Sequence, residues 1–159
     1  TISDGNQSNL LAASDLSEAT LETALTTAQK IKDDRGILIG ASVVSLHIPV
    51  DYWAVADKIL SSPGNTGTSA AAANPNTNAI NAIRNMGMVP EGYFINRRLT
   101  DTDAWFMKTD VPNGTKMFVR SPLQTKMEPD FDTGNLRFKA RERYSFGVSD
   151  WRGFFGSAG

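Results

Sequence analysis

Residues 37–60 read ILIGASVVSLHIPVDYWAVADKIL, a strand-like run followed by a helix-like run. Its first part, residues 37–48, is rich in β-branched and aliphatic side chains, which is typical of one or two buried strands. Pro49 ends that run and suits the first turn of a helix. The helix is predicted by apolar residues that share one face, namely Tyr52, Val55, Ala56, Ile59 and Leu60.

A second helix is predicted upstream of this stretch, over residues 17–33. Ser17 is a good N-cap, and Glu18 follows it in the positive first turn. Apolar residues then recur at helical spacing as Leu21, Ala24, Leu25, Ala28 and Ile31. Residues 1–14 are small and polar, so residues 1–35 are expected to form an N-terminal tail and a helix.

The downstream part of the chain is expected to be rich in strands. Turn residues separate five candidate strands, at residues 88–93, 104–108, 117–120, 136–143 and 144–148. Gly153 and Gly156 indicate an irregular ending. The pattern predicts an α+β fold, with a mixed or antiparallel β-sheet flanked by helices.

The clearest alternation in the chain runs from Leu136 onward. Leu136, Phe138 and Ala140 lie on one side of the predicted strand, and basic side chains lie on the other. We call these the basic stripe: Arg137, Lys139, Arg141 and Arg143. The pattern favours a sheet with one core face and one charged face, so Phe138 is expected in the core, as is Trp105 of an earlier apolar strand. Basic and aromatic residues together leave a nucleic-acid-binding module as an alternative.

Composition limits the possible chemistry. The chain has 159 residues, no cysteine and a net charge of −1, which argues against disulfides, cysteine zinc sites and nucleic-acid binding through overall charge. Charge is uneven, with a net of −4 in residues 1–96 and +3 in residues 97–159. Opposite net charges in the two halves of the chain attract neighbouring copies head to tail. An ordinary solvated surface is the more common interpretation of such a charge distribution. No apolar run has the length of a membrane helix, so no membrane contact is expected.

No catalytic residue, cofactor or metal is expected. His47 is the only histidine, so a small hydrolase would have to use it with Asp51 or Asp57, and a structural histidine is favoured. Glu128, Asp130 and Asp132 alternate, but they read as a solvated turn rather than a divalent-ion site.

Residues 65–78 form a low-complexity loop, NTGTSAAAANPNTN. Its small polar residues bury little apolar surface, so we expect a partner chain to order it. Four asparagines in it are candidate interface residues: Asn65, Asn74, Asn76 and Asn78.

The order of three segments carries a family resemblance. After the strand–helix unit of residues 36–62, residues 99–120 read LTDTDAWFMKTDVPNGTKMFVR and residues 131–157 read FDTGNLRFKARERYSFGVSDWRGFFGS. This series resembles tailed-phage major capsid proteins with the Hong Kong 97-like fold, in their Mu-type major head subunit branch. By this resemblance, residues 103–106 are a core tryptophan strand and residues 150–153 a closing segment. Residues 1–35 would end a peripheral domain, and residues 36–159 would form an axial-type domain.

The resemblance implies a structural role rather than an enzymatic one. It implies an icosahedral phage head, made in the host bacterial cytoplasm, in which pentamers and hexamers of this protein enclose double-stranded DNA without sequence-specific binding. Further expected partners are a missing N-terminal part of the subunit and scaffold, portal or decoration proteins. An encapsulin-type bacterial compartment shell is the nearest alternative.

Overall fold

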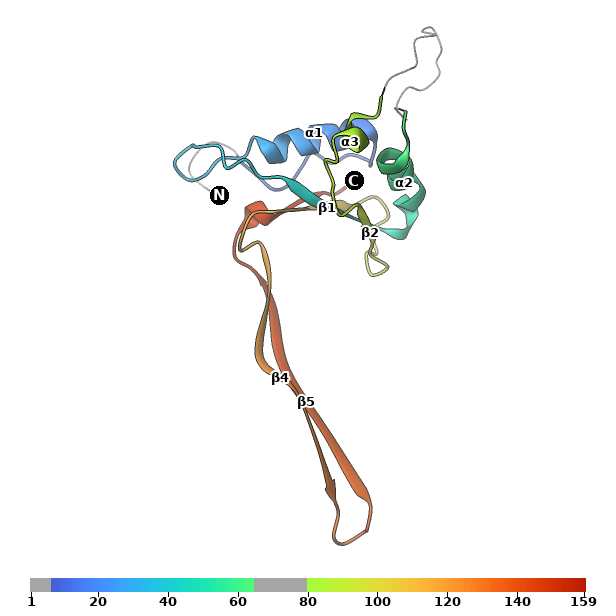
Figure 1. Ribbon diagram of the computed structural model, residues 1–159, viewed down its shortest axis with the longest axis vertical. Helices are drawn as coiled ribbons and strands as arrows, with labels where there is room; N and C mark the ends of the chain where they lie inside the picture. Colours follow the sequence, from blue (N-terminus) through green and yellow to red (C-terminus); the bar gives the residue numbers. More distant parts are fainter. Residues whose placement is uncertain (1–6, 65–79) are drawn as a thin grey trace. The chain divides into compact units, whose positions relative to one another are not determined.

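A computed structural model describes residues 7–64 and 80–159 of the chain. The chain divides into two units (Figure 1). One, the compact unit, comprises Thr1–Gly114 and Asp150–Gly159, and the other, the ribbon, comprises Thr115–Ser149.

The compact unit is built on a four-stranded mixed sheet in the order β2-β1-β3-β6. Strand β1 (Val43–Ile48) pairs in parallel with β2 (Tyr93–Ile95) and antiparallel with β3 (Trp105–Thr109), which pairs antiparallel with β6 (Phe154–Ser157). Together with its helices, this sheet confirms the predicted α+β class with mixed and antiparallel pairing.

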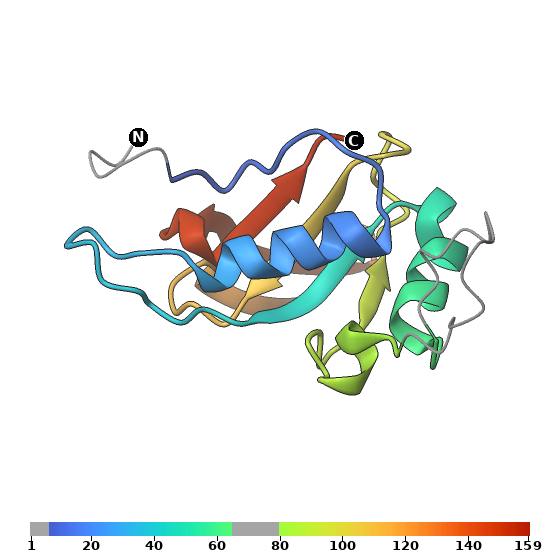
Figure 2. The ribbon, with the colours of Figure 1, turned by 90° about the horizontal axis from the view of Figure 1, so that it is seen from above.

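Helix α1 (Glu18–Gln29) lies across one face of the sheet (Figure 2). A capping box starts the helix, because the Ser17 hydroxyl accepts from the Thr20 amide and the Thr20 hydroxyl accepts from the Ser17 amide. The helix ends before the predicted residue 33. There the Asp33 carboxylate accepts from the amides of Arg35 and Ile37 at 2.8 and 3.0 Å, which favours a turn over another helical turn.

The remaining helices are short. The 3-10 turn η1 (Val50–Tyr52) leads into α2 (Trp53–Ser61), and α3 (Ala82–Asn85) and the 3-10 turn η2 (Trp151–Gly153) follow. Buried Asn81 caps α3 through its side-chain oxygen and donates to the carbonyls of Ile59 and Ser62 in and after α2. Within the described ranges, no helix is long and apolar enough to cross a membrane.

One hydrophobic core joins α1, α2 and the sheet. Trp105 is 1% exposed, and its indole Nε1 donates to the carbonyl of Ser14 at 3.0 Å, which anchors the segment before α1. The other large members of this core are Leu21, Leu25, Leu46, Ile48, Ile59, Met107 and Phe155. Helix α1 and the four-stranded sheet therefore bury their apolar faces against each other.

In the sheet of the compact unit, three further predictions are wrong. Residues 37–42 are not strand, because Gly40 adopts a positive φ of 69° just before β1, and Ile37, Leu38 and Ile39 are exposed. The strand predicted at residues 88–93 begins only at Tyr93. The supposedly irregular ending is strand β6, in which Gly156 lets the ring of Phe106 lie against the backbone.

The ribbon is a single long antiparallel hairpin of β4 (Thr115–Pro129) and β5 (Leu136–Val148). Its turn is closed by two backbone hydrogen bonds: the Asp130 amide donates to the Asn135 carbonyl at 2.8 Å, and the Gly134 amide donates to the Asp130 carbonyl at 3.0 Å. Gly134 adopts the positive φ of 68° that the turn requires. The strands predicted at residues 136–143 and 144–148 are one strand, and the strand predicted at 117–120 is much longer. Pro122 is tolerated within β4 because the register shifts there, between Ser121 and Gln124.

Candidate interaction surface

The basic stripe lies on one face of the ribbon. Directly opposed residues of an antiparallel pair share a face. The register opposes Arg137 to Glu128, Lys139 to Lys126, Arg141 to Gln124 and Arg143 to Ser121. We call this side of the ribbon the basic face. Six of its side chains are cationic and one is anionic, namely Lys116, Lys126, Arg137, Lys139, Arg141 and Arg143 against Glu128.

The acidic side chains of the ribbon neutralise only part of this charge. Arg137 pairs with Asp130 at 2.7 Å, and Lys126 forms an ion pair with Glu128. Lys139, Arg141 and Arg143 are exposed and form no ion pair with any other residue in the described part of the chain. Three of the four stripe residues are thus available to a partner.

The other side of the ribbon, which we call the apolar face, is also exposed. The register places Met117 opposite Phe146, Val119 opposite Tyr144, and Met127 opposite Phe138. The large apolar side chains of this face are all 52–70% exposed: Met117, Val119, Met127, Leu136, Phe138, Tyr144, Phe146 and Val148.

The expectation that Phe138 belongs to the core is therefore wrong for this chain. Phe138 is 60% exposed. The alternation was interpreted correctly, since basic and apolar residues do separate onto two faces. The error was to assume a covering layer, because a hairpin of two strands has no other strands or helices of its own to bury either face.

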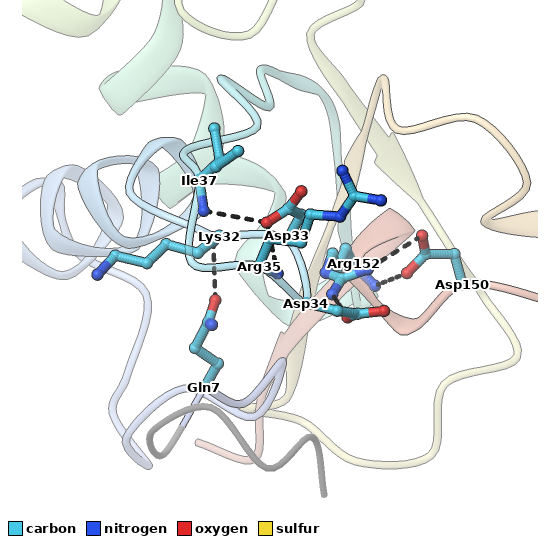
Figure 3. A network of polar contacts seen from close by, with 8 residues as sticks. All are labelled: Gln7, Lys32, Asp33, Asp34, Arg35, Ile37, Asp150 and Arg152. Atoms are coloured by element: carbon cyan, nitrogen blue, oxygen red, sulfur yellow. Dashed lines mark hydrogen bonds and ion pairs between the residues drawn. The ribbon is translucent and has the colours of Figure 1, made fainter.

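A polar network fixes the loop after α1 to the closing segment of the compact unit (Figure 3). The guanidinium of Arg152 binds Asp34 at 2.5 Å, lies 3.7 Å from Asp150, and packs over the ring of Trp151. In the same loop, the amide of Lys32 donates to the Gln7 side chain at 2.8 Å. The backbone amides of Ile37 and Arg35 donate hydrogen bonds to the Asp33 carboxylate, and these bonds lower its pKa. Asp33 and Asp34 are therefore already engaged within the compact unit.

His47 has the surroundings of a structural histidine. Its Nε2 lies 3.2 Å from the Ser45 hydroxyl, and its ring stacks on Phe94 with centroids 5.4 Å apart. Burial lowers the pKa of His47, and the charge of Lys108 adds to that effect. Asp57 instead accepts from the Ser61 hydroxyl at 2.9 Å. In the described part of the chain, no carboxylate is hydrogen-bonded to His47, so the hydrolase interpretation has no triad to rest on.

A hollow of the compact unit lies between α1 and the segment that precedes it, and has a volume of about 700 Å³. Its lining is mostly apolar or hydroxyl-bearing, and Lys30 is the one ionisable side chain among the described residues that form it. Across residues 7–64 and 80–159, no three acidic or histidine side chains gather in a way that could hold a metal ion. Asp130, one of the three alternating carboxylates, accepts hydrogen bonds from Arg137 and from the Thr133 hydroxyl.

The four candidate interface asparagines, Asn65, Asn74, Asn76 and Asn78, lie outside the described residues. The sequence reading missed the exposure of the apolar face and the Arg152 network. The sequence Asp150-Trp151-Arg152-Gly153 carried a signal for that network, since Asp150 caps η2 and Arg152 follows it.

The ribbon exposes both a basic face and an apolar face, and exposed surfaces of this kind mark contacts with other chains. A family model described as "Phage capsid protein" matches residues 1–156. The chain therefore belongs to this phage capsid protein family. It is a structural subunit of the virion capsid and assembles with other capsid subunits. No curated protein matches the chain.

Proposed function

We propose that this chain builds an icosahedral phage head with the Hong Kong 97-like fold, in the Mu-type branch of major head subunits. Copies associate in rings of five and six and enclose double-stranded DNA without sequence-specific contact. Support comes from the family match over residues 1–156 and from the order of the strand–helix unit, the Trp105 strand and the closing segment 150–153.

The main support for an assembly mechanism comes from the positively charged side chains of the basic face that form no ion pair within the described residues. Lys139, Arg141 and Arg143 form no ion pair within the described residues. The ribbon has seven basic and four acidic residues, whereas the compact unit has nine basic and thirteen acidic ones. Such opposite charge favours heterologous contacts, in which the ribbon of one copy meets the compact unit of the next, and contacts of this type close into rings.

The resemblance also supports a division of the chain into parts of two structural domains. Residues 1–35 end a peripheral domain, and residues 36–159 form an axial-type domain. Assembly takes place in the host bacterial cytoplasm, with scaffold, portal or decoration proteins as further partners.

Electron microscopy of particles formed by the full chain tests this proposal. Closed icosahedral shells with fivefold and sixfold rings, filled with DNA when isolated from infected cells, are the expected result. Shells filled with a protein cargo would show an encapsulin-type compartment instead. A chain that stays monomeric at high concentration, with no particle of any kind, would overturn the proposal.

A further inference from the structure

The loop between α1 and β1 exposes three consecutive aliphatic side chains. Ile37 is 62% exposed, Leu38 is 60% exposed and Ile39 is 40% exposed. We call these three residues the aliphatic tip. The loop that holds them projects beyond the end of the sheet in the compact unit (Figure 2). Adjacent exposed aliphatic side chains form an apolar surface of the kind that marks contact with another molecule.

Backbone hydrogen bonds hold the aliphatic tip in one conformation. The Asp33 amide donates to the Ile37 carbonyl at 2.8 Å, and the Ile39 amide donates to the Ile31 carbonyl at 3.1 Å. These bonds, with an antiparallel bridge between them, make residues 31–39 a narrow hairpin. The ion pair between this loop and the closing segment adds a further restraint. Because the tip is already ordered, a partner that buries it has little conformational entropy to remove.

A second group of exposed apolar side chains lies at the other end of β1. Val50 is 49% exposed and Trp53 is 55% exposed, and both follow the carboxyl end of that strand. Ile95, which is 45% exposed, ends the parallel strand β2, where the register places it beside Ile48 of β1. We call Val50, Trp53 and Ile95 the corner patch. The loop of the aliphatic tip precedes the amino end of β1, so the two surfaces lie at opposite ends of the strand (Figure 2).

We propose that the aliphatic tip of one copy docks on the corner patch of a second copy of this chain. This inference rests on the proposed function, in which copies associate in rings, and names a pair of surfaces of the compact unit for that contact. Membership of the capsid family means that the chain assembles with other capsid subunits. Two different surfaces at opposite ends of one unit make a heterologous contact, and contacts of this type close into rings. A contact between two tips would link only two copies.

Opposite charges beside the two surfaces favour the same pairing. Arg35 lies next to the aliphatic tip in the sequence, and Asp51 lies between Val50 and Trp53 of the corner patch. Both side chains are exposed, and neither forms an ion pair with any residue of the ranges 7–64 and 80–159. Contact between a tip and a patch would bring these opposite charges together, whereas contact between two tips would oppose two arginines. Trp53 also supplies the exposed aromatic side chain that is enriched among residues dominating binding energy.

The absence of cysteine from the chain allows a direct test by disulfide formation. The variants Leu38→Cys and Trp53→Cys are made separately in the full chain, mixed in equal amounts and oxidised under assembly conditions. A disulfide forms only where the two Cα atoms come within about 7 Å, so a linked dimer reports contact between the two positions. The variant Met86→Cys is the control, because Met86 is 72% exposed at the end of α3 and belongs to neither surface.

The expected result is a linked dimer of the position-38 and position-53 variants, in yield several-fold above that of the position-38 and position-86 mixture. The position-38 variant alone should give little product. In the otherwise unmodified chain, Arg35→Asp or Asp51→Arg should each weaken association about two- to fivefold, and the double variant should recover most of the loss.

Three outcomes would overturn the inference. They are equal yields or none from the two mixtures, as much product from the position-38 variant alone as from its mixture with the position-53 variant, and no recovery in the double charge variant. Any of these in a preparation whose unmodified chain forms shells would leave the proposed function standing. Absence of shells for the unmodified chain would remove the proposed function itself, so the two failures are distinguishable.

Discussion

At the scale of single residues, Trp105 joins the sheet, α1 and the segment that precedes α1. It is 1% exposed in β3, packs in the cluster that joins α1 to the sheet, and donates to Ser14 ahead of α1. The substitution Trp105→Ala should lower the free energy of unfolding by about 3–5 kcal/mol. Denaturant titration measures this change.

Trp53 is the matched control for that substitution. It lies at the start of α2 and is 55% exposed, so Trp53→Ala should change stability by no more than about 1 kcal/mol. Equal losses for the two tryptophans would contradict the role given to Trp105.

The lowered pKa of His47 predicts that the free energy of unfolding depends on pH. Burial lowers its pKa below the ordinary 6.5 in the folded chain. Between that lowered pKa and 6.5, the unfolded chain binds more protons than the folded one, so stability falls as pH drops through about 6.5. The loss levels off below the folded pKa. The variant His47→Gln should flatten this part of the curve of unfolding free energy against pH, and an unchanged slope would show that His47 is not its source.

At the scale of elements, the sequence predicted best where a pattern was long. The apolar residues at helical spacing from Leu21 onward correctly predicted α1. The alternation after Leu136 correctly predicted β5 and its two distinct faces. Short or interrupted patterns were misread. Strand β6 has only four residues with Gly156 among them, and the apolar residues 37–39 lie before the positive φ of Gly40.

The error over Phe138 has a different cause. Alternation along a strand reports which side chains share a face, and nothing in it reports what covers that face. Burial depends on a second layer, which the ribbon lacks among the described residues. A core position and an interface position therefore have the same local signature, and only the three-dimensional structure separates them.

The close contact between the closing segment and the turn that follows β3 leads to an element-scale prediction. Gly153 in η2 lies so close to Gly114 that a Cβ added at Gly153 would fall on the Gly114 backbone. Since a backbone atom cannot move aside as a side chain does, Gly153→Ala should destabilise the compact unit by about 1–3 kcal/mol. Thermal unfolding measures the effect. Gly147→Ala is the control, because its Cβ would meet only the edge of the Phe118 ring, at 3.4 Å.

At the scale of the whole molecule, opposite charges on the ribbon and on the compact unit predict that association of copies weakens with salt. Exposed charges are screened beyond about 10 Å at 0.1 M ionic strength. The acidic residues that the sequence offers as partners for the basic stripe are Asp33, Asp34, Asp57 and Glu91. Asp34 already binds Arg152, and Asp33 accepts from its own loop. Asp57 and Glu91 remain as candidates on a neighbouring copy.

The variant Arg141→Glu tests this arrangement, because Arg141 is exposed and has no ion pair in the described part of the chain. Exposed pairs are worth only about 0.2–1 kcal/mol each, so assembly followed by light scattering should slow a few-fold at low salt and less at high salt. Lys58→Glu changes the net charge equally but lies in α2 of the compact unit, and should not slow assembly. A second change, Asp57→Lys or Glu91→Lys, should restore part of the rate in the Arg141→Glu background. Equal slowing by the Arg141 and Lys58 variants would mean that net charge alone, rather than the basic face, governs assembly.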